Sequence, residues 1–564
     1  MLALETSIKS VKECIDLLLD NRYIEALEVS GKYAENSLYH SHGHSLLLWF
    51  RAYLSLEMPE IIKAQTSTEK TLEFCDSIRP KTLRDNFFVK LFIKTNYEDF
   101  NDEEIHAELI RNEQILFSTM MELFVDPSLF ALIKVSYRLR NCYLTYKDFS
   151  KMIEFKCWNS DLSRKEFVSA VKLGLGVYNL FFAKMPDRVM NMLSIIGYKG
   201  SIKEGLKMLN ESAFSNTLHS FVSKMVVGAY ECYIDQIFNI NTNRAPAMER
   251  HCESGLQINS HCIWFLVFKG RLNLIDGDID GALEAYHGSL DLTIDVKQLT
   301  NLYLWEITTC YNILGNWPMA RHYIIRLREN CPWSLPTFYY MEGCFLYMEL
   351  ETRLLNDDDA GTFLNSADYD KMRSHINTLF SEVPRHVRRY AGRRIPIEKF
   401  VCEKVEKYND EGILISPGYE LLLVYNLFIY MENMKQLVET VLAHVDRCQK
   451  KFQFDEANES FLLLALLKAV CFRALSRFDD AEPELFKVIS KVDLIKRDRY
   501  LGPLAMLELG VVKMEQGYYG EARHWLNRCK NDFPSYALEL FLQLRLHSAF
   551  YKLRILQKQN GVKN

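Results

Sequence analysis

Small and bulky apolar residues recur along residues 262–336 at a spacing that occurs twice in succession. In the second copy, the small residue Thr308 is followed twelve positions later by Ala320 and then by bulky apolar residues. The first copy places Gly270 and Ala282 at the matching offsets. This spacing is typical of a two-helix unit about 34 residues long, so it predicts two consecutive helix hairpins.

The spacing has a local physical reason. The small residue on the first helix is predicted to face the Ala on the second, which lets the two backbones approach closely. A large side chain there would cost roughly 1 to 3 kcal/mol through overpacking. Gly277 and Gly315 fall at the turns, where a left-handed conformation carries no Cβ penalty, and Pro332 ends its helix. One hairpin cannot bury its apolar face alone, so several must stack.

Four further segments carry the same offsets. Two of them match well and lie next to each other near the C-terminus, whereas the two near the N-terminus are degenerate. Their pairs are Ala469 with Ala481, Gly510 with Ala522, Cys14 with Ala26, and Ala52 with Ala64. Chance spacing in amphipathic helices explains any one copy, but poorly explains two adjacent pairs. The pattern therefore predicts an all-α superhelical solenoid of tetratricopeptide-like repeats with an irregular helical insert.

The predicted organisation has four parts, and no Ser/Gly-rich or Pro-rich linker separates them. We expect degenerate N-terminal repeats, then an irregular helical block, then central repeats with a basic linker, and finally C-terminal repeats. The ranges are 1–125, 126–245, 246–415 and 416–564. A chain of 564 residues can be one continuous solenoid because each repeat contacts only its neighbours.

Composition and charge narrow the setting in which the protein works. A formal charge of −5 gives no global attraction to nucleic acid or anionic membranes. The 14 cysteines contain no C-x-x-C pair, which favours a reducing, cytoplasmic location and leaves nuclear or peripheral membrane association open. The longest apolar runs, 421–431 and 461–475, are shorter than the roughly 20 residues of a membrane span, so we expect no transmembrane segment.

The block from Gly176 to Leu209, "GVYNLFFAKMPDRVMNMLSIIGYKGSIKEGLKML", is helical in character but lacks the repeat spacing. Its glycines, together with Asn179 and Pro186, resemble the signature of the tetratricopeptide repeat protein 39 family, which is related to fungal inclusion-body-clearance proteins. Further segments, including "LYLWEITTCYNILGNWPMARHYIIRL" and "LELGVVKMEQGYYGEAR", are similar to family segments in the same order, from about residue 8 to about 545. The chain departs from vertebrate members around Asp357–Asp359 and in its short tail.

This resemblance implies a soluble all-helical adaptor without known catalytic residues. Some members of the family are linked with lipid or sterol homeostasis, and the fungal relatives with clearing inclusions in connection with lipid droplets. The resemblance is the only source of these two expectations.

Residues of the first helices are predicted to line a concave groove that binds protein partners. They are Trp264, Arg271, Trp305, Asn312, Arg473 and Met514. Aromatic and Arg side chains dominate binding hot spots, which favours the two tryptophans as anchors. The alternatives are that neighbouring helices bury the tryptophans in the core and that the arginines form salt bridges between repeats.

The segment "RHVRRYAGRR" places five arginines in ten residues, at Arg385, Arg388, Arg389, Arg393 and Arg394. Arginine binds phosphate and carboxylate in a bidentate manner, so this patch is a candidate site for an anionic lipid headgroup or an acidic peptide. The alternative is an ion-pair network with the glutamates that follow it, which we favour.

No metal or cofactor is expected. His40, His42 and His44 alternate, and on a helix His42 would be separated from the other two, so a solvated turn between helices is the favoured interpretation. Asp357–Asp359 lacks the Gly and terminal Glu of a calcium loop and is predicted to be an acidic surface loop. No nucleotide-binding loop, nucleophile elbow or zinc-protease motif occurs, so we expect no enzyme.

Two functions from different classes remain. The first is a non-catalytic adaptor that holds protein partners, and the second is a peripheral lipid-binding or lipid-carrying solenoid. An open concave groove would favour the first, whereas an apolar cavity with unfilled volume would favour the second.

Overall fold

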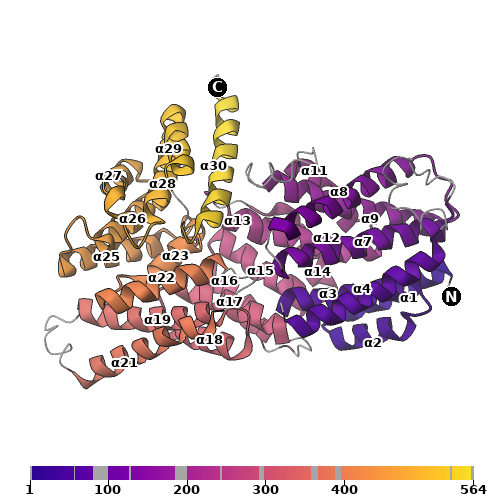
Figure 1. Cartoon of the computed structure of the whole chain (residues 1–564), viewed down its shortest axis with the longest axis horizontal. Helices are drawn as coiled ribbons and strands as arrows, with labels where there is room; N and C mark the ends of the chain where they lie inside the picture. The colour runs from indigo at the N-terminus through magenta and orange to yellow at the C-terminus, as the bar shows by residue number, and fades with distance from the viewer. Residues whose placement is uncertain are drawn as a thin grey trace. The chain divides into compact units, whose positions relative to one another are not determined.

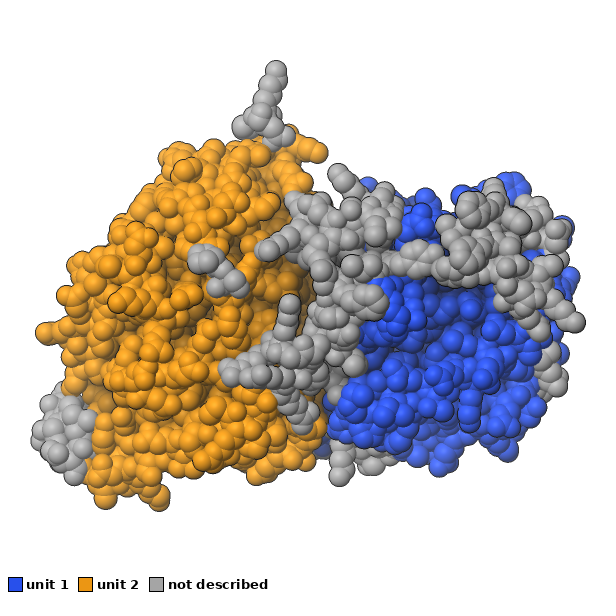
Figure 2. All heavy atoms as spheres, viewed as in Figure 1, with its two compact units in different colours: residues 1–230, 246–268, 289–300 blue, residues 231–245, 269–288, 301–564 orange. Residues whose placement is uncertain are grey.

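The computed structural model describes residues 3–55, 57–79, 100–125, 129–184, 200–241, 244–290, 292, 297–356, 366–387, 395–533 and 536–560. Within these ranges the regular elements are helices and no strand occurs, so the all-α prediction is confirmed. The chain forms two compact units, which Figure 1 shows as ribbons and Figure 2 shows in two colours. Unit 1 comprises residues 1–230, 246–268 and 289–300, and unit 2 comprises residues 231–245, 269–288 and 301–564.

Unit 1 is built from helices that pack against their neighbours along the chain, as α3 packs against α4 and α9 against α11. Its helices are α1 (Leu4–Leu19), α2 (Tyr23–Tyr33), α3 (Leu38–Ser55), α4 (Met58–Ile78), α7 (Asp102–Val125), α8 (Leu129–Met152), α9 (Asp161–Lys184), α11 (Ile202–Ala213), α12 (Leu218–Gly228) and α14 (Pro246–Ile258). Aromatic side chains such as Tyr146, Phe149 and Phe167 fill the core under α7, α8 and α9.

A π-helical turn, Ala229–Ile234, and the short α13 (Asp235–Ile237) follow α12. The boundary between the units runs through the next helices of the chain, which are α15 (Ile263–Asp276), α16 (Ile279–Leu290) and α17 (Lys297–Ile313). The predicted divisions at residues 125 and 415 fall inside unit 1 and unit 2, and the division into four parts remains a prediction.

Unit 2 continues as a run of hairpins, with α26 packed on α27 and α28 packed on α29. Its helices are α18 (Trp317–Asn330), α19 (Leu335–Asn356), α21 (Ala367–Glu382), α22 (Pro396–Glu411), α23 (Pro417–Val424), α24 (Phe428–Met431), α25 (Lys435–Phe452), α26 (Glu459–Ala474), α27 (Phe478–Ile489), α28 (Leu501–Glu515), α29 (Tyr519–Asn531) and α30 (Glu539–Gln559). Two short 3-10 turns, Pro384–His386 and Val492–Leu494, complete the set.

Each of the six predicted repeat copies coincides with a helix hairpin. The pairs are α1 with α2, α3 with α4, α15 with α16, α17 with α18, α26 with α27, and α28 with α29. The turns of three of these hairpins use a glycine with positive φ, at Gly277 (87°), Gly315 (67°) and Gly517 (85°). Asn21 and Ser476 adopt the same left-handed conformation without being glycine. These turns therefore require a left-handed residue, and Asn or Ser adopts that conformation where the glycine is missing.

The predicted small residues lie where helices come closest. Ala282, Thr308 and Ala320 are fully buried. A Cβ added to Gly270 would lie 2.3 Å from the ring of Tyr286, which follows Ala282 by one turn of α16. The first helix therefore needs a small residue at this position because a bulky side chain of the second helix occupies the adjacent space.

One helix of unit 1 meets the length and composition of a membrane span. It is α9, Asp161–Lys184, and 72% of its most apolar stretch is buried inside the protein. Burial of this extent is typical of the core helix of a globular unit.

The prediction that His40, His42 and His44 lie in a solvated turn is wrong. All three belong to α3, and His40 and His42 are buried. Two of the imidazole rings are satisfied by hydroxyl groups, since Ser37 contacts His40 and Ser30 contacts His44. As expected for a helix, His42 points to a different set of partners. Asp357–Asp359 lies outside the described residues.

We expect Gly270→Ala to destabilise the protein by roughly 1 to 3 kcal/mol, because the new methyl group would overlap the Tyr286 ring. The measurement is the free energy of unfolding by chemical denaturation. Gly288→Ala is the matched control on α16, since a Cβ at Gly288 meets no atom within 4 Å. The control should be neutral or stabilising by up to about 1 kcal/mol. Equal effects of the two substitutions would contradict the packing argument.

Candidate functional site

Unit 1 contains an apolar cavity of about 210 Å³. Its wall is formed mainly by α1, α3 and α12, with single residues from α7 and α15. The lining residues are Val11, Cys14, Ile15, Leu18, Tyr39, His42, Gly43, Leu46, Leu47, Trp49, Phe50, Tyr53, Phe117, Leu218, His219, Phe221, Val222 and Trp264. Only a few of these side chains are polar, so the cavity can hold an apolar group but offers few hydrogen bonds to it.

The cavity wall follows from helical periodicity. On α3 the lining residues run from Tyr39 through His42 and Leu46 to Tyr53, at steps of three, four and seven residues. Such steps place side chains on one face of a helix. The face carries two polar groups at its N-terminal end and aromatic groups further along. Helix α3 therefore supplies more of the cavity lining than any other helix.

The polar end of the cavity leads to a buried cluster of charged groups. The Nε2 atom of His42 lies 3.0 Å from Oε2 of Glu113, and Nε2 of His219 lies 3.2 Å from Oε1 of the same carboxylate. All three side chains are almost completely buried, although they come from three different helices, α3, α7 and α12. Glu166 on α9 stands on the other side of His219, with its Oε2 3.9 Å from Nδ1.

Close packing of α9 against α11 fixes the position of α12. A Cβ on Gly200 would lie 2.2 Å from the carbonyl oxygen of Asn179, and one on Gly205 would lie 3.0 Å from the carbonyl oxygen of Gly176. The Oδ1 atom of Asn179 also accepts a hydrogen bond from the backbone of Ser201. These residues belong to the block that suggested the family, whereas Pro186 and Gly197 of the same block lie outside the described residues.

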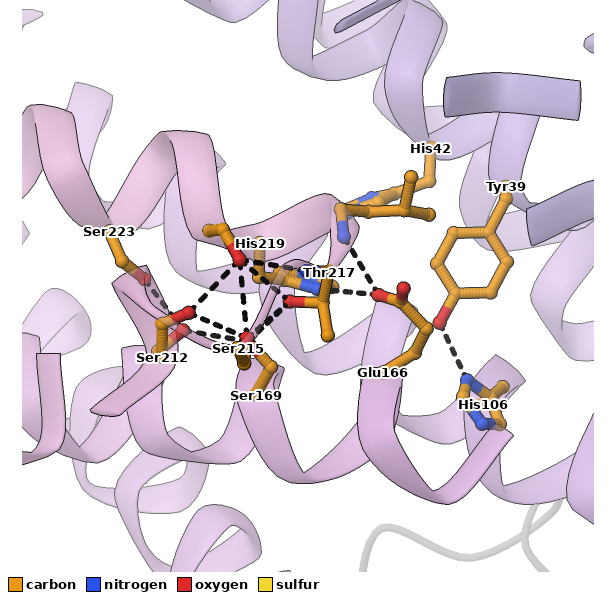
Figure 3. Close-up of polar contacts among 12 residues, drawn as sticks. Tyr39, His42, His106, Glu166, Ser169, Ser212, Ser215, Thr217, His219 and Ser223 are labelled. Atoms are coloured by element: carbon orange, nitrogen blue, oxygen red, sulfur yellow. Dashed lines mark hydrogen bonds and ion pairs between the residues drawn. The ribbon is translucent and has the colours of Figure 1, made fainter. Parts of the chain in front are cut away.

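A network of hydroxyl groups joins the end of α11 to the start of α12 (Figure 3). Ser169 on α9 contacts Ser212 at 2.8 Å and accepts a hydrogen bond from Thr217 at 2.7 Å. Thr217 forms a capping box with Ser220 at the first turn of α12. Glu166 accepts a hydrogen bond from the backbone N–H of Leu218. His219 is therefore held at a fixed point, the second residue of a well-capped helix.

The charges of the cluster stabilise one another. Burial works against charging Glu113, but His219 and then His42 outweigh it and lower the pKa of Glu113 to about 2. Burial likewise opposes the charged form of His219, yet Glu113, assisted by Glu166, raises its pKa to about 10. Without a ligand, this pair is a buried ion pair at neutral pH.

A second buried histidine of the same core behaves in the opposite way. Nδ1 of His106 shares a hydrogen bond with the hydroxyl of Tyr39, 2.6 Å away, and its Nε2 lies 3.0 Å from the hydroxyl of Ser163. Burial lowers the pKa of His106 to about 4. The ring is therefore neutral, and it fixes Tyr39 at the edge of the cavity.

The pKa of His106 predicts a loss of stability in acid. The unfolded chain takes up a proton near pH 6.5 and the folded chain only near pH 4, so the free energy of unfolding falls as the pH drops through this interval. The difference in pKa corresponds to roughly 3 kcal/mol. We expect His106→Gln to reduce the change in the free energy of unfolding between pH 6.5 and 4. The measurement is unfolding by denaturant at a series of pH values, with a chelator present to remove metal ions. His261→Gln, on an exposed histidine, should leave the profile unchanged.

Unit 2 contains another histidine and carboxylate cluster, Glu351 with His444 and Cys448. Here hydrogen bonds account for both carboxylate oxygens. Glu351 accepts one from the backbone N–H of Ser416 (3.0 Å) and one from its hydroxyl (3.2 Å), and His444 lies 2.9 Å away. The carboxylate thus holds Ser416 in its left-handed conformation at the start of α23.

The six residues predicted to contact a partner are mostly buried. Arg271, Asn312, Arg473 and Met514 are at most 5% exposed, Trp264 is 7% exposed, and only Trp305 is half-buried. Trp264 packs on Phe50 and lines the cavity, which matches the alternative of burial by neighbouring helices. A direct role in partner binding remains a prediction, and burial leaves five of the six little surface for it.

The two arginines form buried ion pairs, as the alternative interpretation held. Arg271 pairs with Glu306 at 3.1 Å and lies over the ring of Tyr233 at 4.4 Å. Arg473 pairs with Glu508 at 2.7 Å and with Glu432 at 2.9 Å. Removing one partner of such a pair leaves a buried charge and typically costs about 3 to 5 kcal/mol.

Of the predicted arginine patch, only Arg385 is described, and it is exposed and paired with Glu382. Arg388, Arg389, Arg393 and Arg394 lie outside the described residues. The repeat-packing residues Ala469, Ala481 and Ala522 are buried in α26, α27 and α29, and a Cβ on Gly510 would lie 2.7 Å from Leu526.

An aromatic cluster lies on the surface of unit 2, on the second helices of the last two repeats. Phe486 on α27 is 39% exposed, and its ring lies 5.6 Å from that of Trp525 on α29. Arg528 lies over the Trp525 ring at 5.3 Å, and His524 contacts the same ring edge-on at 5.2 Å. The sequence pattern did not indicate this cluster, because it joins residues of two different repeats.

Stacked hairpins with left-handed turns and small residues at the close contacts define this chain as a helical-repeat protein of the tetratricopeptide type. The chain belongs to the family Iml2/Tetratricopeptide repeat protein 39, whose model matches residues 12–475. It is 25% identical over 554 residues to Tetratricopeptide repeat protein ttc-39B of Caenorhabditis elegans, an alignment that covers 97% of this chain and 92% of the relative. The resemblance inferred from the sequence is thereby confirmed.

Among solved structures, the chain is similar to that described as the Crystal Structure of the Yeast Tom70. The two share 13% identity, and the alignment covers 99% of each chain with a TM-score of 0.27. A TM-score of this size carries no argument about fold or function.

Proposed function

We propose that this protein is a non-catalytic scaffold that binds protein partners through its helical repeats. Helical-repeat proteins present extended surfaces to partners, and the family to which this chain belongs is of that type. The observation that carries the proposal is the surface cluster formed by exposed Phe486 with half-buried Trp525 and Arg528. Aromatic and Arg side chains are the groups that dominate hot spots in protein interfaces.

The position of the cluster supports this role. Its members belong to α27 and α29, which pack against α26 and α28, and the buried pairs of Arg473 and Arg545 with Glu508 tie this part of the unit together. A partner would therefore meet side chains presented by two firmly packed helices. Such preorganisation lowers the entropic cost of binding.

The proposal predicts that Phe486→Ala with Trp525→Ala removes one defined set of partners. Proximity labelling in cells with the full chain would identify neighbours, and the affinity of a purified neighbour would then be measured. Loss of a hot spot of at least about 2 kcal/mol weakens binding roughly 30-fold. Trp333→Ala is the matched control, since Trp333 is 43% exposed in the same unit and lies outside the cluster. Identical neighbours and affinities for all variants would remove the cluster as the docking site.

A second candidate function, binding of an apolar small molecule or lipid chain, is favoured by the cavity in unit 1. Its volume of about 210 Å³ exceeds that of engineered cavities of about 150 Å³ that bind benzene. Its lining is mainly aliphatic and aromatic, as in sites for apolar ligands.

This second function predicts saturable binding of the fluorescent fatty acid cis-parinaric acid, at about one molecule per chain. Val222→Trp should fill part of the cavity and weaken binding at least about tenfold, since the added ring competes with the ligand for volume. Ile62→Trp, at a position that is 54% exposed on α4, is the control for adding an indole. Equal binding by both variants would show that the probe binds elsewhere.

A further inference from the structure

The buried cluster of His42, Glu113 and His219 has the composition and spacing of a metal-binding site. Two imidazoles and a carboxylate approach one another from α3, α7 and α12, and their candidate ligand atoms all lie within 4.8 Å of one another. Ligands about 2.0 to 2.1 Å from a tetrahedral ion are separated by roughly 3.3 Å. The observed N···O distances of 3.0 and 3.2 Å, which run to the two different oxygens of Glu113, are close to that separation.

The contacts within the cluster are short but are not aligned as hydrogen bonds. Nε2 of His42, Oε2 of Glu113 and both ring nitrogens of His219 are buried and lack a hydrogen-bond partner. A misaligned contact also occurs between Nε of Arg473 and Oε2 of Glu508, but the cluster around Glu113 gathers four such atoms from three residues. Buried polar atoms in folded proteins are nearly always paired, so this cluster requires an explanation. A cation placed among them would satisfy the atoms that converge on Glu113.

The cluster around Glu351 provides the comparison. It has similar residue types and burial, but its carboxylate is fully engaged by Ser416 and His444. That cluster is complete as a hydrogen-bonded cap for α23. Only the cluster around Glu113 has this set of unpaired atoms, among the two histidine–carboxylate groups found in the described part of the chain.

The surroundings of His219 also fit a metal ligand. A histidine that binds a metal through Nε2 usually donates its Nδ1–H to a carboxylate, a carbonyl or water. Nδ1 of His219 faces Glu166 at 3.9 Å. Nδ1 of His42 lies 3.0 Å from Nε2 of Gln114, whose carbonyl oxygen accepts hydrogen bonds from Ser45 and Thr68, so this amide would have to flip before it could accept a proton from His42.

We propose that His42, Glu113 and His219 bind a divalent cation of the zinc class. Two nitrogen ligands and one carboxylate match the preference of Zn²⁺, which is commonly bound by His and Glu at three protein positions plus one open position. His42 and His219 also line the apolar cavity, whereas Glu113 does not. The open position therefore lies on the cavity side, where a small ligand would reach the ion.

The test uses the full chain after treatment with a chelator, titrated with Zn²⁺ and separately with Co²⁺. We expect one ion per chain and absorption bands of tetrahedral cobalt without thiolate charge-transfer bands. The latter control matters because Cys157 is exposed and Cys331 is partly exposed. His42→Gln and His219→Gln should each weaken binding at least about 100-fold, and Glu166→Gln should weaken it about 10- to 100-fold.

His40→Gln and His44→Gln are the matched controls, because both residues lie on α3 and contact hydroxyl groups away from Glu113. They should bind the ion as the parent chain does, and circular dichroism would confirm that every variant is folded. Absence of binding to the folded parent chain, thiolate bands in the cobalt spectrum, or an affinity of the His42→Gln or His219→Gln variant equal to that of the parent chain would each overturn the proposal. The measurement is independent of protein-partner binding and of fatty-acid binding.

Discussion

Close approach of adjacent helices is the constraint on which the rest of this structure depends. In the repeats it occurs where a glycine leaves space for a bulky side chain, as at Gly270 beside Tyr286 and Gly510 beside Leu526. The irregular block uses the same device, with Gly176 and Gly205 between α9 and α11. Because protein interiors are packed as densely as organic crystals, a single methyl group at such a contact displaces a helix. These contacts therefore set how adjacent helices are placed within each unit.

Buried charges give each unit its internal connections. In unit 2, Asp498 lies 3.0 Å from Lys404 and 2.7 Å from Lys407, both on α22, so the segment before α28 is fixed to an earlier helix. Burial opposes the charge of Asp498, but the two lysines outweigh it and hold its pKa below the usual value. In unit 1, Glu113 has a comparable role toward His219, with contacts that are short but misaligned. The first arrangement is complete, whereas the second leaves buried ring nitrogens and a carboxylate oxygen without an aligned hydrogen bond.

The fold was largely accessible from the sequence, but the candidate site was not. The spacing of Thr308 and Ala320 predicted a hairpin because the interactions that create it lie within one repeat. The partner-binding residues were placed by analogy with an open groove, and Arg271 and Arg473 instead pair with glutamates of other helices. Whether a long side chain faces solvent or a neighbouring helix depends on how repeats stack, which a single repeat does not encode.

The histidines of α3 separate what the sequence determines from what only the tertiary structure decides. By itself, the sequence determined an all-helical chain of stacked hairpins, the positions of its turns and its family, because these depend on local spacing and on the conformational freedom of glycine. Only the tertiary structure decided that His42 meets Glu113 and His219, and that α1, α3 and α12 line one apolar cavity. Such contacts join residues that are distant along the chain, and they are set by the packing of several helices at once.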